Sequence, residues 1–282
     1  MTMIVQEQAL RPLIIMTPLL ILAVAQGADP PQDDKALAEE FRLFASKEAS
    51  AYTIRLPGSD QPLTLQPEPV LKWSNPVIGT VFGDVFIWTD HGRPEAVASI
   101  YRFYSAPFHR ANEFHSLALR PLVGKRDGAT VWTPIKPGLD LKPIPGAAAP
   151  ADSAPARLRQ LRALAQEFTG RQTNREGVDR DMRLLSQPVN RYENTLAVLI
   201  DGGLFAFVLG TDPEVFLLIE ARQSAAGPLE WQFGATRMNS INLRLYHRGQ
   251  EIWSVPEITW ARAFDSTHAY VLFGFDVETK RK

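Results

Sequence analysis

The sequence predicts an α+β fold in which a unit of one helix followed by an antiparallel meander occurs twice, the two copies packing as one pseudo-twofold body. Three observations support this prediction. Part of the chain repeats itself at a fixed offset of 119 residues. Each half opens with apolar residues at helical spacing, and strand patterns paired around a turn then follow. Because one helix covers only one face of such a sheet, the other face is expected to be buried against the second copy.

The repeat is clearest where residues 63–100 are aligned without a gap with residues 182–219. Nine of the 38 aligned pairs are identical. They are Leu65/Leu184, Pro69/Pro188, Val70/Val189, Asn75/Asn194, Gly83/Gly202, Phe86/Phe205, Pro94/Pro213, Glu95/Glu214 and Ile100/Ile219. Shorter matches follow with small shifts and pair 37–41 with 164–168, 116–119 with 240–243, and 131–132 with 252–253. The shared order of these matches favours an internal duplication over chance.

The composition limits the function classes. With 45% hydrophobic and 22% charged residues in 282, the chain is typical of a globular protein with a sizeable core. The net charge of -1 gives no electrostatic basis for binding nucleic acid. The absence of cysteine excludes disulfides, thiolate nucleophiles and thiolate metal ligands.

Residues 1–25 have the pattern of a signal peptide. Arg11 precedes an apolar run over residues 13–25, which ends in the small-x-small sequence Ala-Val-Ala at residues 23–25. The run is shorter than the roughly 20 residues that cross a bilayer, and Pro18 interrupts it. We therefore expect a bacterial-type exported protein, periplasmic or extracellular, with no membrane span after cleavage. A retained membrane anchor is the alternative.

The first unit is expected at residues 29–133. It opens with a helix near residues 33–48, where Leu37, Phe41 and Phe44 recur at helical spacing. The turn at residues 89–94 contains Asp, Gly and Pro, which favour a hairpin between the strands on either side. The strands predicted in this unit cover residues 81–88, 95–104, 114–122 and 129–133.

A connector rich in proline and alanine is expected at residues 134–153, and we predict that it does not continue a sheet. The second unit follows at residues 154–282. Its helix is predicted over residues 154–169, with Pro155 in the first turn and Gly170 after its end. Its strands are predicted over residues 204–209, 214–221, 230–236, 240–247, 250–254 and 268–276. Apolar residues at consecutive positions in the first two of these strands predict burial on both faces.

Comparison of the two copies also selects candidate functional residues. Residues kept in both copies are explained by the fold, whereas polar and aromatic residues found only in the first copy are candidates for a use of their own. The candidate ligand-binding residues are Trp88, Arg93, Tyr101, Arg102 and Tyr104. We expect an exported, non-catalytic module that takes an unknown apolar ligand or a protein partner in the groove between sheet and helix. The alternatives are that these side chains simply face water, or that a homodimer buries them.

A second set suggests a metal site. His109, Glu113 and His115 combine imidazole and carboxylate ligands, which suit zinc and similar ions. Their spacing differs from that of the zinc-protease helix, so a polar loop entering a strand is the alternative. A cell-envelope hydrolase using these residues or paired carboxylates is the competing function. The known nucleophile, phosphate, dinucleotide and calcium-binding motifs are missing from the sequence, so we assign no catalytic residue and no cofactor.

Overall fold

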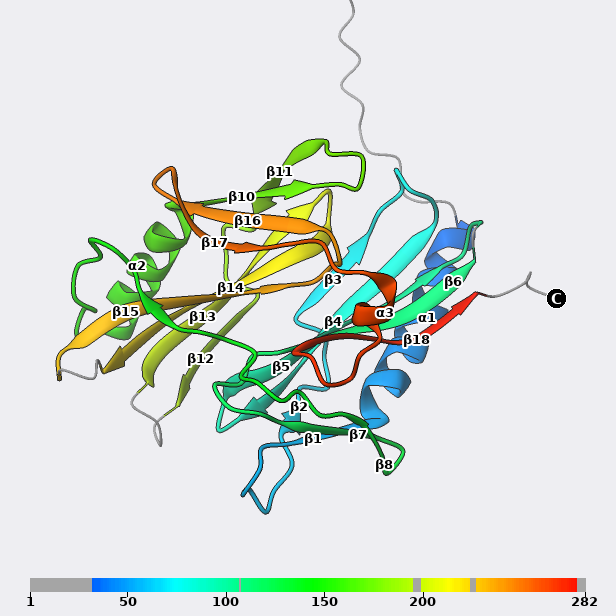
Figure 1. Cartoon of the computed structure of the whole chain (residues 1–282), viewed down its shortest axis with the longest axis horizontal. Coiled ribbons are helices and arrows are strands. Elements are labelled where there is room, and N and C mark those ends of the chain that lie inside the picture. The colour runs from blue at the N-terminus through cyan, green and yellow to red at the C-terminus, as the bar shows by residue number, and fades with distance from the viewer. Residues whose placement is uncertain (1–31, 107, 195–198, 224–226, 278–282) are drawn as a thin grey trace, which may run out of the picture.

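A computed structural model describes residues 32–106, 108–194, 199–223 and 227–277 (Figure 1). The predicted signal peptide therefore lies outside the described residues. Antiparallel strands dominate the fold and helices are few, which fits an α+β or a mostly β class. Within the described ranges, no helix is long and apolar enough to cross a membrane.

The elements follow one another in a regular order. The first half contains α1 (Gln32–Ser50), β1 (Tyr52–Arg55), β2 (Thr64–Leu65), β3 (Leu71–Ser74), β4 (Val81–Asp90), β5 (Arg93–Phe103), β6 (His109–Ser116), β7 (Val123–Arg126) and β8 (Ala129–Trp132). The second half contains α2 (Ala154–Gln166), β10 (Phe168–Thr173), β11 (Asp179–Leu184), β12 (Asn190–Asn194), β13 (Leu199–Leu209), β14 (Asp212–Gln223), β15 (Leu229–Arg237), β16 (Asn242–His247) and β17 (Gln250–Val255). Three further elements are β9 (Lys142–Pro143), α3 (Trp260–Ala263) and β18 (Tyr270–Val277).

The strands of the two halves pair in a similar order. They differ in that β1, β7 and β8 form a sheet of their own in the first half, whereas the pairing of β10 with β11 joins the second-half strands into one sheet. In the first half, β2 and β3 pair with β4, β4 pairs with β5, β5 pairs with β6, and β7 lies between β1 and β8. In the second half, β11 and β12 pair with β13, β13 with β14, β14 with β15, and β16 lies between β10 and β17. Each sheet also receives a strand that follows the other half, because β9 pairs with β15 and β18 pairs with β6.

The registers correspond residue by residue at the 119-residue offset. Trp73 lies opposite Gly83 in the first half, and Tyr192 lies opposite Gly202 in the second. A Cβ atom on either glycine would overlap the facing ring, which explains why both positions are glycine. The long hairpins of the two halves are each interrupted at the same point, between Trp88 and Thr89 and between Phe207 and Val208.

Tight turns also recur. Asp127 and Gly128 join β7 to β8, while Arg248 and Gly249 join β16 to β17. All four residues have positive φ between 48° and 84°. Two successive residues with positive φ match the twist of a two-residue hairpin, and this favours Gly at the second place.

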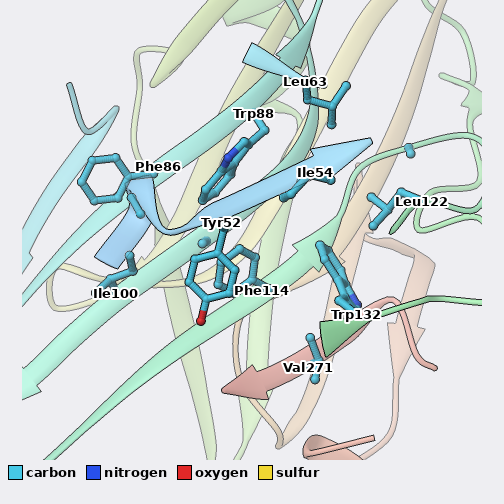
Figure 2. Close-up of a cluster of buried hydrophobic side chains, with 14 of the residues drawn as sticks. Tyr52, Ile54, Leu63, Phe86, Trp88, Ile100, Phe114, Leu122, Trp132 and Val271 are labelled. Atoms are coloured by element: carbon cyan, nitrogen blue, oxygen red, sulfur yellow. The ribbon is translucent and has the colours of Figure 1, made fainter. Parts of the chain in front are cut away.

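Three large apolar clusters, and a small fourth one around Ile258 and Tyr270, make the core of the described residues. In the first, Phe41, Ala45 and Ala49 of α1 face a set of large side chains from the first sheet and from β1 and β8. Figure 2 shows part of this cluster, with Trp88, Phe114 and Trp132 at its centre. The second cluster lies between α2 and the second sheet, and the third lies between the two sheets. In Figure 1 the two helices lie at opposite ends of the molecule, each against its own sheet.

Both sheets are therefore covered on two faces. In β13, Phe205 and Phe207 join the cluster under α2, whereas Leu204 and Ala206 join the cluster between the sheets. This agrees with the prediction of burial on both faces. The alternative that the first-half candidates simply face water is wrong for Trp88 and Arg93. Both are buried, because β4 and β5 are covered over most of their length by α1 on one side and by the second sheet on the other.

Several boundaries differ from the predictions. Helix α2 ends at Gln166, and Gly170 lies within β10, where its N–H and carbonyl belong to the ladder rather than to a helix end. The connector does contribute a strand, β9, in which proline is tolerated because the strand is at an edge. Two of the short sequence matches are not equivalent in the fold. Residues 164–168 run from α2 into β10 whereas residues 37–41 lie within α1, and residues 116–119 end β6 whereas residues 240–243 enter β16.

Candidate functional site

A groove of about 900 Å³ opens between the first half of α1 and the β3–β4 edge of the first sheet. Ligand sites of small molecules have volumes of roughly 300–1,000 Å³, so this groove has a suitable size. Its lining from α1 includes Lys35, Ala38 and Arg42; its lining from the sheet edge includes Lys72, Trp73, Pro76, Val81 and Phe82. We call it the α1 groove. Its lining combines apolar side chains with three cations and with the carboxylates of Asp34 and Glu39.

One buried carboxylate lies among the charges of the α1 groove. Asp84 is buried on β4, and its Oδ2 atom has no hydrogen-bond partner. Burial raises the pKa of Asp84 to about 6, while the charges of Lys72 and Arg42 act in the opposite direction. Arg42 also contacts Glu39 at 3.2 Å, but both of these side chains are exposed.

In the second half, the positions aligned with Lys72 and Phe82 hold charged residues that bind each other. Asp201 is aligned with Phe82, and Arg191 is aligned with Lys72. Arg191 Nη2 lies 2.6 Å from Asp201 Oδ2, and Arg157 Nε of α2 lies 2.9 Å from the same oxygen. Arg157 also donates to the carbonyls of Ala151 and Asp152, which holds the end of the connector next to α2. An internal ion cluster thus occupies, in the described part of the second half, the positions aligned with Lys72 and Phe82 of the α1 groove.

A group of buried ion pairs lies at one end of the apolar cluster between the two sheets. We call this group the arginine cluster. Arg93 Nε donates to Glu220 Oε1 at 2.9 Å, and Arg93 Nη1 donates to Glu95 Oε1 at 2.8 Å. Tyr192 donates its hydroxyl to Glu220 at 2.8 Å. Burial acts to lower the pKa of Arg93, but the charges of Glu220 and Glu95 outweigh it and leave this pKa raised. The arginine cluster thus joins β5 of the first sheet to β14 of the second.

The other end of the inter-sheet cluster has the opposite chemistry. Asp212 is aligned with Arg93 and Glu214 with Glu95, and both face Glu113 of β6. Burial raises the pKa of Glu113 to about 8 and that of Asp212 to about 7, and it raises the pKa of Glu214 well above its ordinary value. Glu113 accepts a hydrogen bond from the Tyr270 hydroxyl. We call Glu113, Asp212 and Glu214 the carboxyl cluster.

The predicted ligand-binding residues are not gathered in one groove. Trp88 is 1% exposed and belongs to the core under α1 (Figure 2). Arg93 belongs to the arginine cluster, and Tyr101 packs between the sheets, where its ring lies 5.9 Å from that of Trp73. Arg102 and Tyr104 lie on the α1 side. Their location is closest to the expectation, because Tyr104 packs edge-on against Phe82 of the α1 groove.

The three predicted metal ligands lie on β6 with other contacts. His109 stacks on Phe103 at 4.1 Å, and Glu113 accepts a hydrogen bond from Tyr270. His115 Nδ1 lies 2.8 Å from the Ser116 carbonyl, and burial lowers the pKa of His115 to about 4. Among the residues that the structure describes, no group of three or more His, Asp or Glu is placed to hold a metal ion.

Sequence reasoning missed the residues that line the α1 groove. A signal was present in the aligned copies, because Phe82 stands opposite Asp201 and Lys72 opposite Arg191. A carboxylate in one copy that becomes a ring in the other marks a change of use, but only the fold shows that these two positions neighbour a helix.

Comparison of the chain with protein-family models, with curated proteins and with solved structures found no match.

Proposed function

We propose that this protein is an exported, non-catalytic module that binds a small ligand with an apolar part in the α1 groove. The observation that carries the proposal is the difference between the two halves. Asp201 is bound by Arg157 and Arg191 in the second half, whereas in the first half its aligned position holds an apolar ring, Phe82, which lines an open groove. A protein keeps such a groove unfilled at the expense of stability, so a bound ligand is the simplest reason for it.

We also propose that the two halves arose by internal duplication, with units at residues 29–133 and 154–282 and a connector at residues 134–153. Equal pairing order, equal registers at an offset of 119 residues and turns with matching positive φ all support this. The proposal matters for function because it makes the second half an internal reference. The change from the ion-paired Asp201 to Phe82 beside the groove is then a feature that the first half has gained or retained for a use.

A binding role is favoured over catalysis by where the titratable groups lie. Among the described residues that line the α1 groove there is no histidine. The groups with strongly raised pKa values belong to the carboxyl cluster between the sheets. Among the described residues that line the α1 groove, no carboxyl or imidazole has a shifted pKa that suits a general acid or base; Asp84, which lies near Lys72 and Arg42, has one.

Export is proposed from the signal-peptide pattern of residues 1–25 alone, with the periplasm or the extracellular space as the destination. Native mass spectrometry of the chain from residue 26, recovered from its own exporting cells, tests both export and binding. We expect an added mass that disappears on denaturation. A bare dimer would instead favour a protein-interaction surface.

A matched pair of variants locates the ligand. Ala38→Trp fills the α1 groove from the helix side and should abolish the added mass. Ala129→Trp places the same ring on the exposed strand β8 and should leave the added mass unchanged. Equal loss in both variants, or none in either, would contradict the proposed site.

The second candidate is a cell-envelope hydrolase. The carboxyl cluster is the observation in its favour, because neighbouring buried carboxyls with raised pKa values are common at catalytic sites. Turnover of an envelope polysaccharide that is lost in Glu113→Gln, with the fold retained, would support this candidate over the binding module.

A further inference from the structure

We propose that the ligand of the α1 groove carries a carboxylate, which Lys72 and Arg42 bind, on an apolar chain that lies against Phe82. This inference rests on the proposed binding function and names the chemistry of the ligand. An aliphatic carboxylic acid of medium or long chain has both features.

The second half supplies the template for the carboxylate. There, Asp201 lies within 2.6–2.9 Å of nitrogen atoms from Arg157 of α2 and Arg191 of β12. The Asp201 side chain is only 4% exposed, so its charge depends on these two arginines. A carboxylate bound between a helix and a strand is thus already part of this fold.

The first half has a cation in place of Arg191, but it has no carboxylate in place of Asp201. Lys72 is aligned with Arg191, and Arg42 of α1 lines the same groove. Phe82 takes the position of Asp201. Within the described part of the chain, Lys72 forms no ion pair within 4 Å, and its charge acts to lower the pKa of the buried Asp84. A ligand carboxylate would supply the partner that Asp201 supplies in the other half.

Phe82 explains why the rest of the ligand should be apolar. Its ring is half-buried and packs against Phe41 and Tyr104, so its position is fixed from below and beside. Val81 and Pro76 add apolar surface to the groove. An alkyl chain here is removed from water, whereas a second charge would face an apolar wall.

The test titrates the mature full-length protein with three probes that share a ten-carbon chain: decanoate, decan-1-ol and decyltrimethylammonium. Isothermal titration calorimetry should give the tightest binding for decanoate. Lys72→Met should weaken decanoate roughly tenfold, since it removes one charged contact, and leave decan-1-ol unchanged. Lys125→Met removes an exposed lysine on β7 and should change neither affinity.

Phe82→Asp recreates the second-half arrangement and should lose decanoate, because an internal carboxylate then occupies Lys72. If this variant does not fold, as judged by circular dichroism, Lys72→Met still decides the question. Equal affinity for decanoate and decan-1-ol, or tighter binding of the cation, would overturn the carboxylate inference while the groove still binds an apolar chain. Absence of binding by all three probes would overturn the proposed function as well.

Discussion

Replacing Arg93 with methionine should destabilise the protein strongly, because this guanidinium neutralises two buried carboxylates that belong to different sheets. Arg93 is 3% exposed, and the Glu220 side chain is fully buried. Methionine has a similar length and fills the same space, so the change removes charge and hydrogen bonds with little loss of packing. Among the described residues, Glu220 then keeps Tyr192 and Arg222 as partners, and Glu95 loses the cation that binds it.

The expected loss in the free energy of unfolding follows from the burial of Arg93 and its two carboxylate partners. Removing one partner from a buried ion pair costs about 3–5 kcal/mol, because the other charge stays in a medium of low dielectric. Burial already raises the pKa of Glu95, and the charge of Arg93 opposes this rise. Without Arg93 the pKa of Glu95 rises further, so the folded variant holds a proton that the unfolded chain releases. The loss of stability of the variant relative to the wild type should therefore become smaller as the pH falls towards 4.5 and larger as the pH rises above it.

Urea denaturation followed by tryptophan fluorescence at pH 4.5 and pH 7.5 measures both effects. Arg171→Met is the matched control, because Arg171 pairs with Asp181 in an exposed position and its loss should leave stability unchanged within error. A deficit below about 1 kcal/mol at pH 7.5, or one that does not depend on pH, would refute the claim that the arginine cluster stabilises the contact between the sheets.

Three further predictions follow from the same structure. Gly83→Ala and Gly202→Ala should each lower the free energy of unfolding by about 1–3 kcal/mol, since the new methyl group overlaps an aromatic ring in both halves; thermal melts that match the wild type would contradict this. Burial raises the pKa of Glu113 to about 8, so the wild type should lose stability, on the order of 3–5 kcal/mol, as the pH rises from 4.5 to 8, and Glu113→Gln should lose much less over that window in urea titrations. Asp201→Asn should destabilise by about 2 kcal/mol, because it weakens the bonds from Arg157 and Arg191; a stability equal to that of the wild type would show that the ion cluster contributes nothing.

The repeated elements were predictable because they depend on local patterns. The alignment of Gly83 with Gly202 follows from the sequence, and in the structure both residues face an aromatic ring across the strand pair. The hairpin around residues 89–94 was also predictable, since Asp, Gly and Pro favour a turn whatever surrounds it.

The candidate site was less predictable, because burial depends on what the other half covers. Trp88 has the sequence context of an exposed strand residue, yet α1 covers it completely. Tyr101 is covered by the second sheet, which no pattern within the first half reveals. Gly170 was assigned to a helix end because glycine often follows a helix, but here a close approach of Met182 and Phe207 requires it within a strand.

The two halves exchange strands: β9, which follows the first half, pairs with β15 of the second sheet, and β18, which follows the second half, pairs with β6 of the first. Ile144, next to β9, is buried in the core of the second half, and Val271 of β18 is buried in the core of the first. Neither half can therefore leave the other without withdrawing a strand from its partner's sheet. A single proteolytic cut between residues 146 and 153 would leave two fragments that each still hold a strand in the other, and such a nicked molecule should stay assembled and unfold in one step.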